Sequence, residues 1–256
     1  MAFSFLSWQS ALICAAYFAA GLVDSICGGG GLITVPALMA LGVPVHSIAG
    51  TNQCSALAGN LASIYKYVRS GNVSFKAGII AALAAIPGGI IGAELNMIIP
   101  GKYLEAVMIA LMPVMALVIM LKKNFGEKDL SDKVSDVKQA LYSCLIGLVI
   151  GAYQGFYGPG AGMLYMLAFA LLIRFNLVRA SGTAKLATLF AAISSSAAYA
   201  VSGLVIWQIV LAATVFNIVG NYIGAGIAVK NGAKTIRPVL IGVILLLFVK
   251  LVSGLF

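Results

Sequence analysis

The sequence predicts an all-α polytopic membrane protein made of two inverted-topology repeats. Each repeat is expected to hold about five helical segments, with a short or re-entrant half-helix after a glycine-rich break. The first observation is composition: of 256 residues, 62% are hydrophobic and 9% are charged, and the mean hydropathy is +1.06. A soluble domain carries roughly 25% charged residues, so a water-soluble enzyme is excluded. The other two observations are recurrent apolar stretches and an internal repeat.

Apolar runs between polar or glycine breaks define ten segments. They cover residues 2–25, 31–41, 47–68, 74–98, 103–121, 139–156, 162–173, 180–201, 206–229 and 236–252. Most are long enough to cross a hydrocarbon core of about 30 Å. The second and seventh are short and reach about half to two thirds of the way across, so we expect half-helices that end inside the membrane. The chain then divides into repeat one (1–121), a polar linker (122–138) and repeat two (139–256), within one integral membrane domain.

The internal repeat rests on an almost constant offset between small residues. At an offset of 130 residues, the matches are Gly21 with Gly151, Gly28 with Gly158 and Gly30 with Gly160. At an offset of 132 residues, they are Gly50-Thr51 with Gly182-Thr183, Ser70-Gly71 with Ser202-Gly203, Gly88 with Gly220 and Gly92 with Gly224. Chance matches among abundant glycines are easy, but a constant offset over so many positions is not. We therefore expect a duplicated fold.

Basic residues predict how the two copies are oriented. The loop after the third segment carries Lys66, Arg69 and Lys76, whereas its counterpart around residues 202–203 carries no base. Because basic loops stay in the cytoplasm, equivalent loops of opposite charge character predict inverted copies with an odd number of crossings each. Three crossings plus a re-entrant hairpin, or five crossings, satisfy this parity. Both place the termini outside and the linker in the cytoplasm. The net charge of +9 is thus an orientation signal, and we expect no nucleic-acid partner.

The strongest local signal is a pair of glycine-rich turns that each precede a short apolar segment. The residues are Gly28, Gly29, Gly30 and Gly31 in the first copy, and Gly158, Gly160 and Gly162 in the second. A glycine turn that leads into a helix presents unpaired N–H groups and the positive end of the helix dipole, which favour an anion. Two facing turns would form an anion cradle. The alternative is that these glycines only permit tight helix crossing.

Polar residues that open the third and eighth segments supply further candidates. Thr51, Asn52, Gln53 and Thr183 are expected to orient a ligand by hydrogen bonds. Lys185 stands inside an apolar stretch, where a lysine is costly and normally faces a cavity or a partner. It is the candidate cationic contact to an anion. The alternatives are snorkelling to a surface or an ion pair with Asp24.

Asp24 is the candidate for coupling transport to a proton, because a carboxyl group inside the membrane can titrate. It can equally be a fixed counter-charge to Lys185 or a cap near the bend. We expect no cofactor and no metal: Cys14, Cys27, Cys54 and Cys144 stand singly, and His46 is the only histidine. The phosphate-loop-like residues 232–235 lack the required earlier glycine, which argues against ATP-driven transport.

These motifs resemble those of the sulfite exporter TauE/SafE family of membrane permeases. The resemblance rests on residues 28–36 (GGGGLITVP) with 49–52 (AGTN), and on residues 158–162 (GPGAG) with 181–183 (SGT). It implies a cytoplasmic-membrane transporter of a bacterium or archaeon for sulfite, sulfonates or related small anions, often acting outward. Ala184 stands where the first copy has Asn52 and breaks the symmetry of the motif.

The sequence therefore predicts a secondary transporter, an exporter of a small anion bound at the repeat interface near the midplane. Its partners are the anion, the lipid bilayer and a coupling ion, either a proton or sodium. The alternatives are an anion channel, a carrier of a carboxylate or another oxyanion, and a membrane subunit with no transport of its own. The protein is not expected to be an enzyme.

Overall fold

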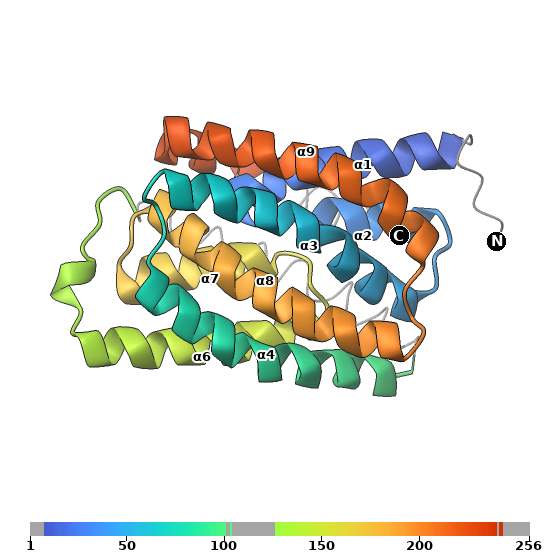
Figure 1. The fold of residues 1–256 in the computed structure, drawn as a ribbon, viewed down its shortest axis with the longest axis horizontal. Helices are drawn as coiled ribbons and strands as arrows, with labels where there is room; N and C mark the ends of the chain where they lie inside the picture. The colour runs from blue at the N-terminus through green and yellow to red at the C-terminus, as the bar shows by residue number, and fades with distance from the viewer. Residues whose placement is uncertain (1–7, 101–102, 104–125, 240, 243–256) are drawn as a thin grey trace.

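The helices of this protein lie side by side, with their axes along the long axis of the molecule (Figure 1). The computed structural model describes residues 8–100, 103, 126–239 and 241–242, and within these ranges it contains helices and no strand. The elements are α1 (Trp8–Cys27), α2 (Gly31–Ala40), α3 (Val45–Arg69), α4 (Phe75–Ile98), the 3₁₀ turn η1 (Ser131–Lys133), α6 (Asp136–Phe156), α7 (Ala161–Ala168), the π-helix η2 (Phe169–Ile173), α8 (Leu177–Val201) and α9 (Trp207–Asn231). The all-helical expectation is confirmed over this part of the chain.

Five of these helices are long and apolar enough to cross a membrane, namely α1, α4, α6, α8 and α9. The third expected segment also forms a helix, and its 25 residues make α3 equally long. It is less apolar because it carries polar side chains such as Asn52, Gln53 and Asn60, all of which line the cavity described below. Most of the fifth expected segment lies outside the described residues. Of the tenth, residues 236–239 and 241–242 are described, and they are helical.

The two short segments are confirmed as short helices. α2 has 10 residues, and α7 has 8 residues before it continues into the 5-residue π-helix η2. At 1.5 Å per residue, α2 is about 15 Å long and α7 with η2 about 20 Å. Neither length reaches across a hydrocarbon core of about 30 Å.

The two halves of the chain are interlocked by their helix packing. The most extensive contacts join α4 to α6 and α1 to α9, and each pair takes one helix from each half. Small residues allow this close approach: a Cβ atom on Gly92 in α4 would lie 2.0 Å from the carbonyl oxygen of Ala152 in α6. At the equivalent position in α9, a Cβ atom on Gly224 would lie 2.5 Å from the carbonyl oxygen of Leu22 in α1. Glycine at such crossings is typical of membrane helices.

Two hydrogen bonds join positions that the repeat predicted from the sequence treats as equivalent. The Tyr67 hydroxyl of α3 donates to the Ser25 carbonyl at 2.8 Å, and the Tyr199 hydroxyl of α8 donates to the Gly155 carbonyl at 2.7 Å. These two contacts relate the same positions of the two copies. Equivalent helices, such as α3 and α8, run in opposite directions along the bundle (Figure 1). Reciprocal contacts of this kind are those that a two-fold axis generates.

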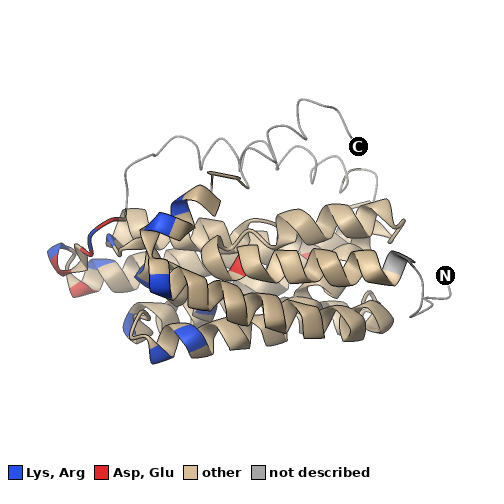
Figure 2. Ribbon diagram, turned by 90° about the horizontal axis from the view of Figure 1, so that it is seen from above, with Lys and Arg blue, Asp and Glu red and all other residues tan. Residues whose placement is uncertain are grey.

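Lysine and arginine residues gather toward one end of the bundle, as Figure 2 shows. Lys66 and Arg69 lie in the last turn of α3, and Lys230 lies in the last turn of α9. At the same end, Asp129 of the linker forms an ion pair with Arg179 of α8 at 2.9 Å. Burial alone would raise the pKa of Asp129, but hydrogen bonds from Ser131 and the Arg179 guanidinium outweigh it and hold this pKa below its ordinary value. The linker residue is therefore fixed to the core as a carboxylate.

Candidate functional site

The two glycine-rich turns meet in the interior. Met163 in the first turn of α7 donates its amide hydrogen to the Gly28 carbonyl at 3.2 Å. Gly28 has a φ of +80°, and a Cβ atom there would lie 2.1 Å from the carbonyl carbon of Gly162. Both the backbone conformation and the close approach therefore require glycine at position 28. The expected facing of the two turns is present in the structure.

Several amide groups at these turns lack partners. Within the described ranges, no group accepts a hydrogen bond from the backbone N–H of Gly30, Gly31 or Gly162. The first N–H groups of a helix have no partner inside the helix, and they carry the positive end of its dipole. α2 and α7 therefore both present unsatisfied donors where the turns meet.

A cavity of about 40 Å³ lies between the turns. This is room for a few water molecules or one small oxyanion. Its lining comes from both halves and consists of Ala20, Asp24, Gly28, Gly30, Gly31, Thr34, Asn52, Gln53, Ala56, Asn60, Gln154, Gly158, Ala161, Gly162, Thr188 and Asn217. The candidates Gly28, Gly30, Gly31, Asn52, Gln53, Gly158, Gly162 and Asp24 are thus brought together. Gly29, Gly160, Thr51, Thr183 and Lys185 are not among the lining residues.

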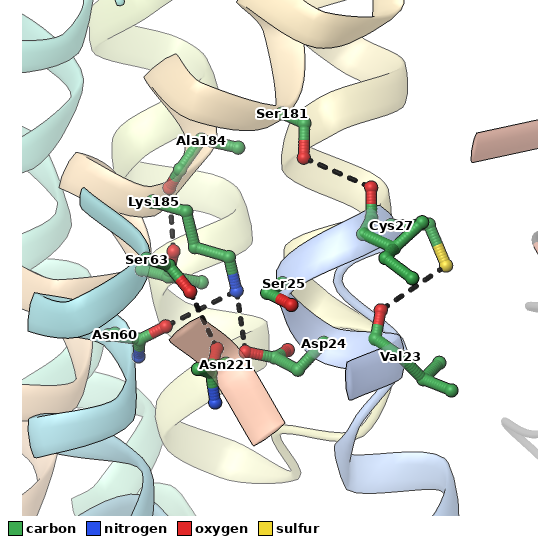
Figure 3. A network of polar contacts seen from close by, with 12 residues as sticks. Val23, Asp24, Ser25, Cys27, Asn60, Ser63, Ser181, Ala184, Lys185 and Asn221 are labelled. Carbon is green, nitrogen blue, oxygen red and sulfur yellow. Dashed lines mark hydrogen bonds and ion pairs between the residues drawn. The ribbon is translucent and has the colours of Figure 1, made fainter. Parts of the chain in front are cut away.

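Lys185 lies directly behind Asp24. Its side chain is 2% exposed, and its ammonium donates to Asp24 Oδ2 at 2.5 Å and to Asn60 Oδ1 at 3.3 Å. Figure 3 shows the lysine reaching from α8 toward these residues of α1 and α3. The ion pair with Asp24, one of the alternatives that the sequence left open, is therefore present. Beside it, the Ser63 hydroxyl donates to Asn221 Oδ1 at 2.7 Å, which extends the polar network to α9.

A neutral pair occupies the position equivalent to this ion pair. Gln53 of the first copy stands at the position of Lys185 in the second, and Gln154 of the second copy stands at the position of Asp24 in the first. Gln53 Nε2 donates to the Gln154 carbonyl at 2.6 Å, and Gln154 Nε2 donates to Gln53 Oε1 at 3.3 Å. Lys185 lies about 12 Å from the start of α8, and Gln53 lies about 12 Å from the start of α3. Because these helices start at opposite ends of the bundle, the cavity lies between a charged pair nearer the basic end and a neutral pair nearer the other end (Figures 1 and 2).

Thr51 and Thr183 occupy structural positions. Both are fully buried, and each hydroxyl oxygen accepts a hydrogen bond from the backbone amide that precedes a helix of the other half. Thr51 Oγ1 accepts from Ile206, before α9, and Thr183 Oγ1 accepts from Ser74, before α4, both at 3.0 Å. In this structure these hydroxyls join the halves and do not face the cavity.

Several lining residues were not predicted from the sequence, namely Thr34, Asn60, Gln154, Thr188 and Asn217. One available signal was polarity itself, since Asn60 and Asn217 stand alone in apolar stretches. Thr34 was masked by its apolar neighbours, although its hydroxyl donates to Asn52 Oδ1 at 2.6 Å inside the cavity. Across the described part of the chain, no group of three or more His, Cys, Asp or Glu side chains has a metal-binding arrangement.

Long apolar helices, two broken helices and a polar cavity between them define an integral membrane protein of the transporter type. Residues 13–251 match the family described as sulfite exporter TauE/SafE, and the chain belongs to this family. It is a membrane transporter of that family.

Curated relatives carry names of the same kind. The chain is 32% identical to "Probable membrane transporter protein ORF9" of Sinorhizobium sp, over 95% of this chain and 92% of that protein. It is also 32% identical to "Probable membrane transporter protein YfcA" of Escherichia coli (strain K12), over 87% of this chain and 81% of that protein. A "Probable membrane transporter protein" of Haemophilus influenzae is 29% identical, over 88% and 87% of the two chains. No solved structure matches the chain significantly.

Proposed function

We propose that this protein is a secondary transporter that exports small anions such as sulfite or organosulfonates, and that it is not an enzyme. The observation that carries the proposal is the cavity into which both glycine turns bring unpartnered amides. A buried polar cavity lined by N–H donors at two helix N-termini favours an anion over a cation. The family description, sulfite exporter, supports an oxyanion as the substrate class.

The polar groups that line the cavity supply the contacts to the anion. The amides of Gly30, Gly31 and Gly162 donate to the anion oxygens. Asn52 adds a side-chain donor, because its Oδ1 accepts from Thr34 while its Nδ2 has no partner among the described residues. Thr188 and Asn217 complete the polar wall. Charge-assisted hydrogen bonds of this kind are about twice as strong as neutral ones.

Alternating access then requires two bodies that move around the cavity. The extensive packing of α1 on α9 and of α4 on α6 links the two halves of the chain, so rocking of repeat one against repeat two would break that packing. α3 packs against α9 and so joins the α1–α9 pair, and α8 packs against α4 and so joins the α4–α6 pair. We therefore assign the moving bodies to α1, α3 and α9 on one side, and α4, α6 and α8 on the other.

The same proposal places the protein in the cytoplasmic membrane of a prokaryote. The end of the bundle that carries the lysines and arginines faces the cytoplasm, by the positive-inside tendency (Figure 2). The linker 122–138 then lies in the cytoplasm, and both termini lie outside.

Purified protein in liposomes tests the function. The expected result is saturable uptake of labelled methanesulfonate or sulfite that is accelerated by the same anion loaded on the opposite side. Such counterflow is a property of carriers. Large single-molecule anion currents without counterflow would instead establish a channel. Failure to move methanesulfonate, sulfite or acetate would contradict the proposal.

A further inference from the structure

The charge in the cavity has the wrong sign for an anion. Among the lining residues that the structure describes, Asp24 is the one charged side chain. Its side chain is 20% exposed, whereas that of its partner Lys185 is 2% exposed. Figure 3 shows the carboxylate held by the lysine ammonium. An anion that enters the cavity therefore meets the carboxylate before it meets the ammonium.

Two negative charges in one desolvated cavity repel each other strongly, because little solvent screens them. The ammonium of Lys185 is already engaged by Asp24 and Asn60, so it offsets only the charge of the carboxylate. Anion binding therefore requires either that Asp24 loses its negative charge or that the cavity accepts an uncompensated one. A proton on the carboxylate removes the repulsion and also releases the ammonium from its ion pair.

We propose that each anion binds together with one proton, which is taken from water by the carboxylate of Asp24. The neutral carboxyl group then leaves Lys185 as the unpaired positive charge beside the cavity, and this charge balances a monovalent anion. No covalent bond to the ligand forms and no group is oxidised: the proton moves from the medium to a carboxylate oxygen. This inference rests on the proposed function and adds the coupling ion to it.

The surroundings of Asp24 contain few competing titratable groups. Lys185 from α8 is its charged neighbour, Cys27 of α1 and Tyr67 of α3 are its neutral titratable neighbours, and the nearby groups of α3 and α9 are the amides Asn60, Asn217 and Asn221. The sequence of α2 holds no titratable side chain, and Tyr165 of α7 donates to the Gly147 carbonyl instead. The carboxylate of Asp24 is therefore the group placed to take the proton.

An uncharged glutamine pair in the same protein serves as a reference for the Asp24–Lys185 ion pair. Gln53 and Gln154, one from each half of the chain, hold the positions that match Lys185 and Asp24 in the repeat. The double variant Asp24→Gln with Lys185→Gln recreates that pair and leaves no buried charge alone. It is therefore expected to fold even where Asp24→Asn, which leaves Lys185 unpaired, does not.

Calorimetry with detergent-purified full chain tests the proposal. Methanesulfonate is the probe, because it stays ionised across the working range. Titrations in bis-tris and in imidazole, which differ in ionisation enthalpy and are not sulfonates, report the protons taken up. We expect uptake of up to about one proton per methanesulfonate, and an affinity that weakens by up to about tenfold per unit of rising pH.

The variants give the matched comparison. Asp24→Asn should bind methanesulfonate without proton uptake and with an affinity independent of pH. The double glutamine variant, which also lacks the ammonium that balances the anion, should bind it more weakly and again without proton uptake. Glu94→Gln, which removes an exposed carboxylate of α4 outside the cavity, should keep the proton uptake. Loss of uptake in this control, or uptake that persists in the double variant, would assign the proton to another group and overturn the proposal.

Failure of this inference is distinguishable from failure of the proposed function. Binding of methanesulfonate by the unaltered protein with no proton uptake at any pH would overturn the coupling and leave the anion site standing. Absence of binding of methanesulfonate, sulfite and acetate at every pH would overturn both.

Discussion

Gly28 and Gly162 touch through their backbones: a Cβ atom on Gly162 would lie 2.7 Å from Cα of Gly28. The two residues are far apart in the sequence, one in each glycine turn. Met163 adds a hydrogen bond from its amide to the Gly28 carbonyl at 3.2 Å. The contact fixes the start of one short helix against the start of the other, and the cavity depends on this arrangement.

Gly28→Ala tests this contact. Gly71 is the matched control, since its φ is +72° but a Cβ atom there would meet nothing within 4 Å. Gly71→Ala should cost only the left-handed strain of about 1–2 kcal/mol. Gly28→Ala should cost about 1–3 kcal/mol more, because its methyl group overlaps the backbone of Gly162. Thermal unfolding of both variants measures the difference, and equal stabilities would contradict the packing described here.

Thr51→Val and Thr183→Val test the reciprocal contacts between the halves. Each substitution leaves a buried amide, that of Ile206 or of Ser74, without its acceptor. We expect each variant to lose about 1–3 kcal/mol of unfolding free energy, by similar amounts, while methanesulfonate affinity is retained. A fall in affinity without a fall in stability would show that these hydroxyls contact the ligand instead.

Asn52→Asp tests whether the cavity binds anions. The substitution keeps the side-chain shape but places a carboxylate beside the anion. Methanesulfonate affinity near neutral pH should fall at least about tenfold, since like charges in an interface cost several kcal/mol. Asn231→Asp adds the same charge at the exposed end of α9 and should leave the affinity unchanged. An unaffected affinity in the Asn52 variant would remove this residue from the site.

Asp129→Asn tests how the linker is held. The folded state lowers the pKa of Asp129, so its carboxylate stabilises the fold above the ordinary pKa and loses this effect as pH falls through the lowered value. The variant should therefore be less stable by up to about 1 kcal/mol near neutral pH, a magnitude typical of partly exposed ion pairs. At a pH below the lowered pKa of Asp129, the two proteins should have equal melting temperatures. A difference that grows with acid would contradict this assignment.

Much of the fold could be predicted from the sequence, because the length of apolar runs and the position of glycine breaks can be read directly along the chain. Apolar length predicted the membrane-length helices, and α2 and α7 were expected from their short apolar runs between glycine breaks. The boundaries shifted by a few residues, as for α6, which begins at Asp136 rather than at residue 139. Helix ends depend on fraying and capping, which hydropathy does not record.

The site was harder to predict because it depends on which helix faces which. The sequence identified Lys185 and Asp24 but left their relation open, since an ion pair across 161 residues has no local signature. It grouped Thr51 with Asn52 as ligand contacts, although adjacent helical residues point in different directions. Thr51 faces the start of α9, whereas Asn52 faces the cavity. Only the packing of the two halves separates these roles.

A structure determined with methanesulfonate bound tests the anion site most directly. The account predicts density for the anion between the two glycine turns, with its oxygens within hydrogen-bond distance of the Gly30, Gly31 and Gly162 amides and the Asn52 side chain. An anion found elsewhere in the protein, with these amides bonded to other protein groups, would contradict it.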